Sequence, residues 1–240
     1  MRYQAVMDLH THTLASGHAY CSLREMAKAA SDKGLEILGI TDHAPMMPGT
    51  CHQYYFDNLK IVPRQMYGIE LLLGSEVNIL NEKGDIDLTG KTLSQMDLVI
   101  ASLHIPCIKP MTKEKNTAAY LNVMKNPYVN IIGHPDDGRY ELDYEALVKG
   151  AKEYGKVLEL NNHSLVPGGS RVDARPRDLE MLNLCKKYGV PIIMDTDSHM
   201  DVQIGEFDLA RELLVEVDFP EELVLNRSKE ALKGHANREL

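Results

Sequence analysis

Two histidines separated by a single threonine, His10 and His12, follow the first apolar run of the chain. In an extended strand, residues i and i+2 point to the same face about 6.5 Å apart, so both imidazoles can reach one cation. A pair with this spacing also arises by chance in many proteins. A metal site therefore needs support from the rest of the chain.

That support comes from further residues of metal-binding type at or after the ends of other apolar runs. They are His18, His43, Glu76, His104, His134, Asp197 and His199. Any one of them could be an ordinary core or loop residue, but core packing does not require polar side chains repeatedly at strand ends. Imidazole and carboxylate ligands suit zinc, manganese or iron. Nine candidates exceed what one tetrahedral ion can use, which predicts a cluster of several ions.

The apolar runs that must position these residues are rich in Val, Ile and Leu, which is typical of parallel strands covered on both faces. Seven candidate strands span residues 5–9, 37–41, 71–76, 98–102, 130–133, 157–160 and 191–195. Helical patterns lie between them, at 22–33, 117–125, 144–154, 176–188 and 206–217. The first of these helices has the clearest start, since Ser22 and Glu25 have the spacing of a capping box.

Strands that alternate with helices predict right-handed βα units. An open doubly wound sheet would bind a ligand at one crevice, whereas a barrel gathers residues from nearly every strand end at one mouth. The repeated polar residues favour the barrel, and seven units predict a (β/α)7 barrel. The length of 240 residues, without an internal repeat or linker, fits a single domain over residues 1–240.

The composition restricts the class of partner. The net charge of −9, without a basic block, should repel a polyanion, so we expect no stable nucleic-acid partner. A small phosphorylated substrate stays compatible, because bound cations can invert the local field. The sequence contains no apolar run of membrane-spanning length and does not begin with a signal-peptide pattern, so we expect a cytoplasmic protein without a membrane partner. The four cysteines are far apart and suggest no thiolate site.

The ordered set of motifs resembles the PHP (polymerase and histidinol phosphatase) family of hydrolases over essentially the whole chain. The motifs are DLHTHT at 8–13, TDH at 41–43, Glu76, His104, His134 with Pro135, and DSH at 197–199. Within that family the chain looks most like the stand-alone YcdX-type phosphatases. The supporting segments are His18-Ala-Tyr20, Ile86-Asp87, Glu159-Leu-Asn161-Asn162 and Gly205-Glu-Phe207.

The resemblance implies a distorted (β/α)7 barrel that binds three divalent transition-metal ions, with zinc expected and manganese or iron as alternatives. It assigns His10, His12, Glu76 and Asp197 to one ion, His18, His43 and His199 to a second, and Glu76, His104 and His134 to a third. Glu76 would bridge two ions, and Glu76 and Asp197 would take part in catalysis. A homotrimer is the oligomer that this resemblance suggests.

The same resemblance implies a phosphatase that hydrolyses a small phosphomonoester. The expected mechanism is in-line attack by a metal-bridging hydroxide, without a covalent phosphoenzyme. A histidinol-phosphate phosphatase is the alternative within the family. A non-catalytic, metal-stabilised module or an exonuclease part of a polymerase is a more distant alternative, because the chain has no basic stripe and retains the whole ligand set.

Some residues near the expected mouth have less defined roles. Arg171 and Arg175, in the loop before the fourth helix, could bind a substrate phosphate through their guanidinium groups. Asp42 could orient a metal ligand without touching the metal, and Asp195 could do the same or form a salt bridge. Two histidines, His52 and His163, could line the mouth, although aromatic packing and a solvated loop are the simpler explanations.

Overall fold

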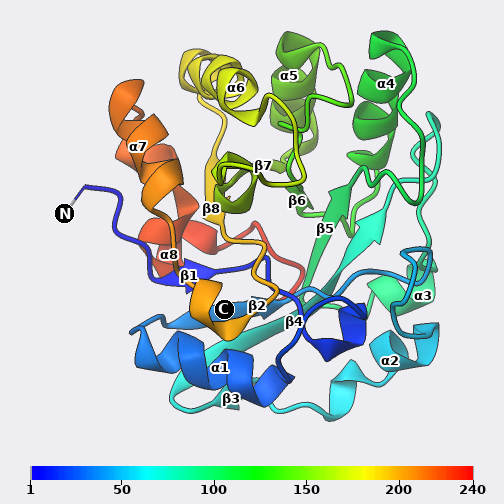
Figure 1. Ribbon diagram of the computed structural model, residues 1–240, viewed down its shortest axis with the longest axis vertical. Helices are drawn as coiled ribbons and strands as arrows, with labels where there is room; N and C mark the ends of the chain where they lie inside the picture. Colours follow the sequence, from blue (N-terminus) through cyan, green and yellow to red (C-terminus); the bar gives the residue numbers. More distant parts are fainter. Residues whose placement is uncertain (1, 240) are drawn as a thin grey trace.

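Seven parallel strands form the centre of the computed structural model, which describes residues 2–239 (Figure 1). The strands are β1 (Met7–Asp8), β2 (Ile37–Ile40), β4 (Ile69–Asn78), β5 (Leu98–Ser102), β6 (Ile131–Ile132), β7 (Val157–Asn161) and β8 (Ile192–Asp195). They are neighbours in this order, which confirms the predicted strand succession. Met1 and Leu240, the ends of the expected domain, lie outside the described residues.

The strand β4 is long enough to serve two neighbours in turn. Its first part, up to Leu73, pairs with β2, and the part from Gly74 onward pairs with β5. A Cβ on Gly74 would lie 1.8 Å from the backbone oxygen of Leu98, so only glycine allows this close approach. The strand β3 (Gln65–Met66) adds a short antiparallel pair to β4, which the sequence analysis did not predict.

The first and last strands close the barrel through a seam of a few contacts. Thr11 and Ser198 form an isolated parallel bridge, and the backbone N–H of His12 donates to the Ser198 oxygen at 2.8 Å. A carboxylate oxygen of Asp195 accepts the backbone N–H of Leu9 at 2.7 Å. The architecture is thus a nearly closed seven-strand parallel barrel, as predicted, and Asp195 binds backbone where a ligand contact or a salt bridge was expected.

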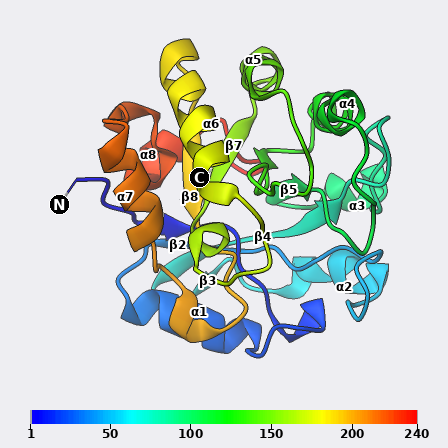
Figure 2. The same cartoon turned by 45° about the horizontal axis from the view of Figure 1, so that its top comes forward.

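Helices cover the outside of the barrel (Figures 1 and 2). They are α1 (Leu23–Asp32), α2 (Gln53–Asp57), α3 (Gly90–Leu93), α4 (Lys113–Val123), α5 (Tyr144–Tyr154), α6 (Ala174–Tyr188), α7 (Asp208–Glu216) and α8 (Lys229–Leu232). The capping box of α1 is present, with the backbone N–H of Ser22 donating to Glu25 at 2.7 Å. Within residues 2–239, no helix has the length and apolar character needed to cross a membrane.

One predicted helix begins at the wrong residue. The pattern placed its start at Thr117, but α4 begins at Lys113, because the Thr112 side chain accepts the backbone N–H of Lys115 and caps the helix there. The side chain of Thr117 instead donates to the backbone oxygen of Lys113 one turn earlier. The helix therefore starts four residues earlier than predicted.

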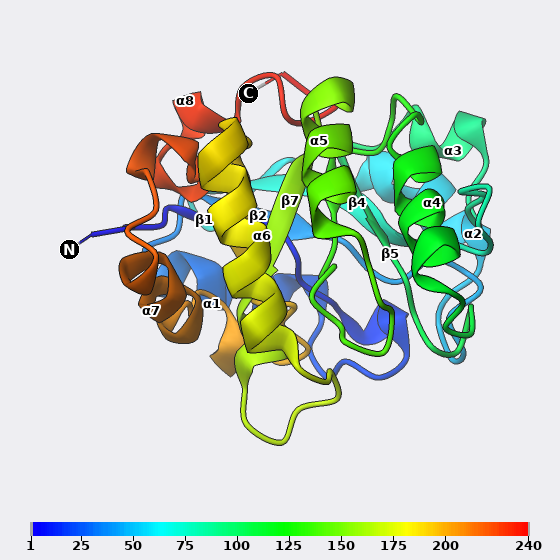
Figure 3. The same ribbon diagram turned by 90° about the horizontal axis from the view of Figure 1, so that it is seen from above.

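Two apolar clusters explain why the strands are apolar on both faces. A smaller cluster fills the barrel and includes Leu9, Leu72 and Ile100, whereas a larger one lies between the strands and the helices. Buried polar side chains, such as those of Glu76, Asn78 and Ser102, lie at the carboxyl ends of the strands. The C-terminal tail and the loop between β7 and α6 lie on opposite sides of the molecule (Figure 3).

Candidate metal centre

The nine predicted ligands come together at the carboxyl end of the barrel, around the carboxylate of Glu76. Glu76 is fully buried near the end of β4. Its Oε1 lies 2.8 Å from Nε2 of His134 and 3.1 Å from Nε2 of His104. Its Oε2 lies 2.7 Å from Nδ1 of His43 and 3.4 Å from Nε2 of His10. One carboxylate thus faces imidazoles that follow four different strands.

Asp197 forms the second acidic part of the cluster. Its Oδ1 lies 3.0 Å from Nε2 of His12 and 3.6 Å from Nε2 of His10. The rings of His18 and His199 lie beside this group, with centroids 4.8 Å apart. Both Asp197 and His134 have left-handed backbone, with φ of 51° and 27°. Such conformations store strain that is common at functional sites.

Hydrogen bonds to the Nδ1 atoms hold several of these imidazoles in one orientation. Nδ1 of His12 donates to Ser16 Oγ at 3.0 Å, and this hydroxyl donates to Asp42 at 2.7 Å. Nδ1 of His199 donates to the backbone oxygen of Asp197 at 2.8 Å. Because Nδ1 is the donor, Nε2 keeps its lone pair for a metal ion. Asp42 therefore contacts His12 indirectly, through the Ser16 hydroxyl.

Two further imidazoles are held in the same way by residues that the sequence analysis did not single out as site residues. Nδ1 of His104 donates to Asn78 Oδ1 at 2.7 Å, and the Asn78 amide donates to Asp87 at 2.6 Å. Nδ1 of His10 donates to Glu159 Oε1 at 2.6 Å. The sequence offered two signals for Glu159, namely its charge inside an otherwise apolar strand and its place in a segment that resembles the family.

The atoms that face the centre of the cluster are buried and have no hydrogen-bond partner among residues 2–239. They are Nε2 of His10, His12 and His104, Nδ1 of His43, Oε2 of Glu76 and Oδ1 of Asp197. The close approach of His43 to Glu76 lacks hydrogen-bond alignment, although the two atoms are 2.7 Å apart. Buried polar atoms without partners are costly unless an ion or water occupies the space between them. The donor set therefore fits metal ions.

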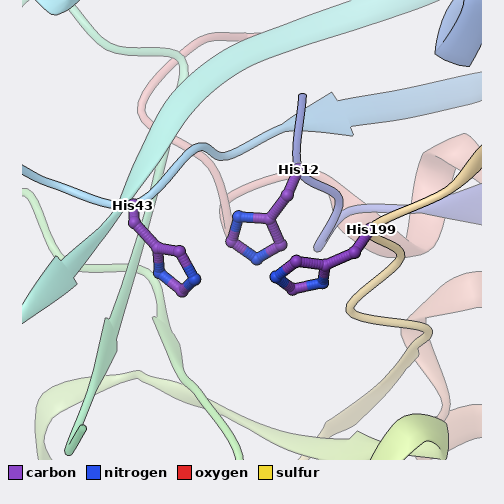
Figure 4. Close-up of side chains that lie close together, drawn as sticks. All are labelled: His12, His43 and His199. Carbon is purple, nitrogen blue, oxygen red and sulfur yellow. The ribbon is translucent and has the colours of Figure 1, made fainter. Parts of the chain in front are cut away.

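Three sets of ligand atoms each lie close enough to hold one ion, within 4.8 Å of one another. The sets are His12 with His43 and His199, His10 with His12 and Glu76, and His43 with Glu76 and His104. Figure 4 shows the first set, with three rings from separate segments turned toward one another. These sets overlap with the grouping that the resemblance implied. They differ from it because His12 and His43 each belong to two sets, whereas the resemblance assigned each of them to one ion.

The protonation states suit metal binding. Burial opposes the charge of Glu76, but the surrounding imidazoles, first that of His104, hold the pKa of its carboxyl well below the usual range. The pKa of His12 is lowered well below its usual value, by burial and then by the neighbouring His43. His10 differs, because nearby carboxylates, first that of Glu159, outweigh its burial and raise its pKa. The negative charge of these carboxylates, which favours a proton on His10, also favours a bound metal ion.

A cavity of about 600 Å³ opens above the cluster. Its floor contains His18, His43, His104, His134, Asp197 and His199. Loops after β2 and β5 contribute apolar walls, with Met47, Pro48 and Ile105 among them. Loops after β6 and β7 contribute polar walls, which include Arg139 and His163. The cavity thus has room for a small molecule that reaches the cluster.

The two candidate arginines lie in different places. Arg171 lines the cavity, donates to Asp197 Oδ2 at 2.7 Å and to Ser164 Oγ at 3.2 Å, and leaves 9% of its side chain exposed. Arg175 forms an ion pair with Glu216 on the outer surface, between α6 and α7. Arg171 is thus placed at the cavity, and Arg175 is placed away from it. His52 caps α2 and packs edge-on against Tyr54.

The chain is similar to known proteins over most of its length. Residues 8–165 match the family model described as the PHP domain. A protein of Clostridium novyi named a probable phosphatase is 49% identical over 97% of this chain and 93% of its own length. A probable phosphatase of Acetivibrio thermocellus is 46% identical over 97% of this chain and 95% of its own length.

A solved structure also has a similar fold. It is the histidinol phosphate phosphatase of Lactococcus lactis, in complex with zinc, L-histidinol and phosphate. The TM-score is 0.63, and the alignment covers 90% of this chain and 95% of that one. Only 20% of the residues are identical, so this likeness concerns the fold.

Proposed function

The chain belongs to the PHP domain family, and we propose that it is a metal-dependent phosphatase that hydrolyses a small phosphomonoester at a three-metal site. The observation that carries the proposal is the group of buried ligand atoms around Glu76 that have no hydrogen-bond partner among residues 2–239. The names of the C. novyi and A. thermocellus relatives support the reaction class.

Three ions would use the ligands that converge here. His10, His12, Glu76 and Asp197 would hold the first, His18, His43 and His199 the second, and Glu76, His104 and His134 the third. Zinc is the first choice, because the donors are imidazole and carboxylate and the similar L. lactis structure contains zinc. Manganese and iron stay alternatives.

The bound ions would supply Lewis acidity, which activates the attacking water and offsets charge on the phosphoryl oxygens. The chain itself holds the ligands in place and encloses the substrate. Arg171 points its guanidinium at the cluster from the loop after β7, where it can bind a phosphoryl oxygen in addition to Asp197. The walls of the cavity then surround the leaving group.

The size and charge of the protein favour a small substrate. A cavity of about 600 Å³ accommodates a molecule the size of a sugar phosphate or an amino-alcohol phosphate. The net charge of −9 opposes the binding of a polynucleotide. Histidinol phosphate is a specific alternative substrate, since the similar L. lactis structure is of a histidinol phosphate phosphatase.

The test is a metal analysis of protein purified without chelator, together with a phosphate-release screen. The screen should compare a generic aryl phosphate, histidinol phosphate, sugar phosphates, nucleotides and amino-alcohol phosphates. We expect bound transition metal and phosphate release that a chelator abolishes. If the metal-loaded protein releases no phosphate but loses thermal stability on chelation, a non-catalytic, metal-stabilised module is the better description.

The two arginines test the substrate contact. Arg171→Ala should lower kcat/KM about 10–100-fold, since a hydrogen bond to a charged group contributes about 1.5–3 kcal/mol. The loss should be expressed largely in KM, as measured by steady-state phosphate release. Arg175→Ala should have no comparable effect, because its guanidinium pairs with Glu216 at the surface. An equal loss in both variants would contradict the assignment.

Two expectations from the sequence stay predictions. A homotrimer would be detected by light scattering of the purified chain. A cytoplasmic location would be tested by fractionation of cells that express it.

A further inference from the structure

Glu159 is a buried carboxylate in the middle of β7, beneath the candidate metal centre. Its neighbours in the strand, Leu158 and Leu160, are apolar and fully buried, and Glu159 itself has no exposed surface. An ionised carboxylate in such a place is costly unless its oxygens are well paired. Its partners therefore indicate what it does.

Both oxygens of Glu159 bind groups that belong to candidate ligands. Oε1 accepts from Nδ1 of His10 at 2.6 Å. Oε2 accepts from the backbone N–H of His134 at 2.5 Å and from the side-chain amide of Asn161 at 3.2 Å. His10 follows β1 and His134 follows β6, so one carboxylate joins two ligand segments that lie 124 positions apart in the numbering (134 minus 10).

We propose that Glu159 is a positioning residue that fixes the tautomer of His10 and the backbone of His134, and so sets one ligand in each of two metal positions. This inference rests on the proposed function for the metal positions themselves. Glu159 does not touch the metal or the substrate in this proposal. It acts through the two histidines.

The effect on His10 follows from the chemistry of the carboxylate. An ionised carboxylate only accepts hydrogen bonds, so Nδ1 of His10 must carry the proton. Nε2 then has a free lone pair, and this atom faces Glu76 and Asp197 at 3.4 and 3.6 Å. With the opposite tautomer, Nε2 would carry the proton and could not bind a metal ion.

The effect on His134 concerns the backbone. His134 has a φ of 27°, which is strained for a residue with a side chain. The hydrogen bond from its N–H to Glu159 helps to hold this conformation. The same conformation directs Nε2 of His134 to Glu76 Oε1, at 2.8 Å.

Substitution by glutamine separates this role from simple burial, because the amide has one oxygen and one NH2 group. The position of Oε2 receives two donors, from His134 and Asn161, so the amide oxygen should occupy it. The NH2 group must then face Nδ1 of His10. A donor at that position requires Nδ1 to accept, which moves the proton to Nε2. Glu159→Gln should therefore remove His10 as a ligand while the side-chain shape is kept.

The experiment measures zinc affinity by competition with a chelator of known affinity. We expect Glu159→Gln to weaken the binding of zinc about 10–100-fold, the usual loss when a residue that orients a ligand is replaced. Asp97→Asn is the matched control, because Asp97 is also a buried carboxylate, but it binds Arg64 and the backbone of Leu73 at the other end of the barrel. Its zinc affinity should equal that of the unaltered protein.

A second measurement does not depend on the variant folding. Nitrogen-15 spectra of the imidazoles in the zinc-loaded, unaltered protein report which ring nitrogen of His10 carries the proton. A proton on Nδ1 supports the proposal, and a proton on Nε2 overturns it. Unchanged zinc affinity in Glu159→Gln, or an equal loss in Asp97→Asn, would overturn it as well.

These readouts are independent of phosphate release. If the unaltered protein binds zinc, and Glu159→Gln weakens the binding as expected, the role of Glu159 holds even when no substrate is hydrolysed. In that case the proposed phosphatase activity fails alone. If phosphate release persists although His10 carries its proton on Nε2, the proposed role of Glu159 fails and the proposed phosphatase activity stands.

Discussion

The two ends of the barrel both contain buried polar residues, but they use them differently. At the amino end, Asp97 accepts from Arg64 at 2.7 Å and from the backbone of Leu73 at 2.9 Å. Lys156, which directly precedes β7, donates to the backbone oxygens of Asn126 and Val129 at 3.0 and 2.6 Å. At the carboxyl end, buried atoms of Glu76 and His12 have no such partner within the described chain, residues 2–239.

This difference shows that burial of a polar group does not by itself indicate function. A buried group whose partners are all supplied by the chain stabilises the fold. A buried polar group that is held in place but lacks a hydrogen-bond partner in the chain is available to bind a ligand. Asp97 and Lys156 at the amino end thus have their partners within the chain, whereas the facing atoms of Glu76 and His12 at the carboxyl end do not. The following predictions test this distinction, from the largest expected effect to the smallest.

The largest effect is expected for Glu76→Gln. The change keeps the volume but removes the charge that five imidazoles face, those of His10, His12, His43, His104 and His134. Phosphate release should fall at least about 10³-fold, since metal-ion catalysis supplies several kcal/mol. Metal content, measured by plasma mass spectrometry, should fall as well. If both stayed intact, the carboxyl end would not be a metal-dependent site.

Chelation should have the next largest effect. Removing bound metal leaves the carboxyl end with unpaired buried groups, so the unfolding free energy should fall by several kcal/mol. Calorimetry with and without chelator measures this through Tm. The control is Glu76→Gln, whose Tm should respond much less to the chelator. A chelator-insensitive Tm in the unaltered protein would remove the distinction between the two ends.

Asp97→Asn should affect stability alone. The neutral amide replaces the ion pair with Arg64 by an uncharged hydrogen bond, which should lower the unfolding free energy by about 1–3 kcal/mol. Urea titration measures the loss. Metal content and the KM for a phosphate ester should not change, because the other end of the barrel is untouched. A loss of metal here would mean that the two ends are coupled.

The smallest effect concerns pH and Lys156. Burial lowers the pKa of its ammonium group in the folded protein. Between that lowered pKa and the ordinary value of 10.5, the unfolded chain binds more protons than the folded one, so rising pH should stabilise the fold. Relative to Lys156→Met, the unaltered protein should gain stability as the pH rises toward this value. Urea titrations of both proteins at several alkaline pH values measure the difference, and parallel pH profiles would refute it.

Much of the fold could be predicted because its strands are buried on both faces. Apolar runs such as 98–102 agree with the observed strand, and the residues after each run meet at one mouth. Other parts depend on tertiary contacts that no local pattern contains. The strand β3 forms because it pairs with β4. The strand predicted at 130–133 is shorter in the structure, where β6 contains only Ile131–Ile132.

The candidate site was predictable to the same extent and for a similar reason. His and Asp residues recur directly after successive apolar runs, and this repetition is visible in a single sequence. Glu159 has no such repeat, since it lies inside a strand and its role appears only when His10 and His134 are brought to it. Arg171 and Arg175 are close in sequence, but only the fold separates the cavity from the outer surface.

The seam between the first and last strands has a consequence for biosynthesis. His10 and His12 are made early, whereas Asp197 and His199, on the other side of the seam, are synthesised more than 180 residues later. A nascent chain therefore carries isolated histidines for most of its synthesis, without the carboxylate that completes their site. We therefore expect metal to be loaded late in synthesis, since a polypeptide that ends before residue 197 lacks Asp197 and His199.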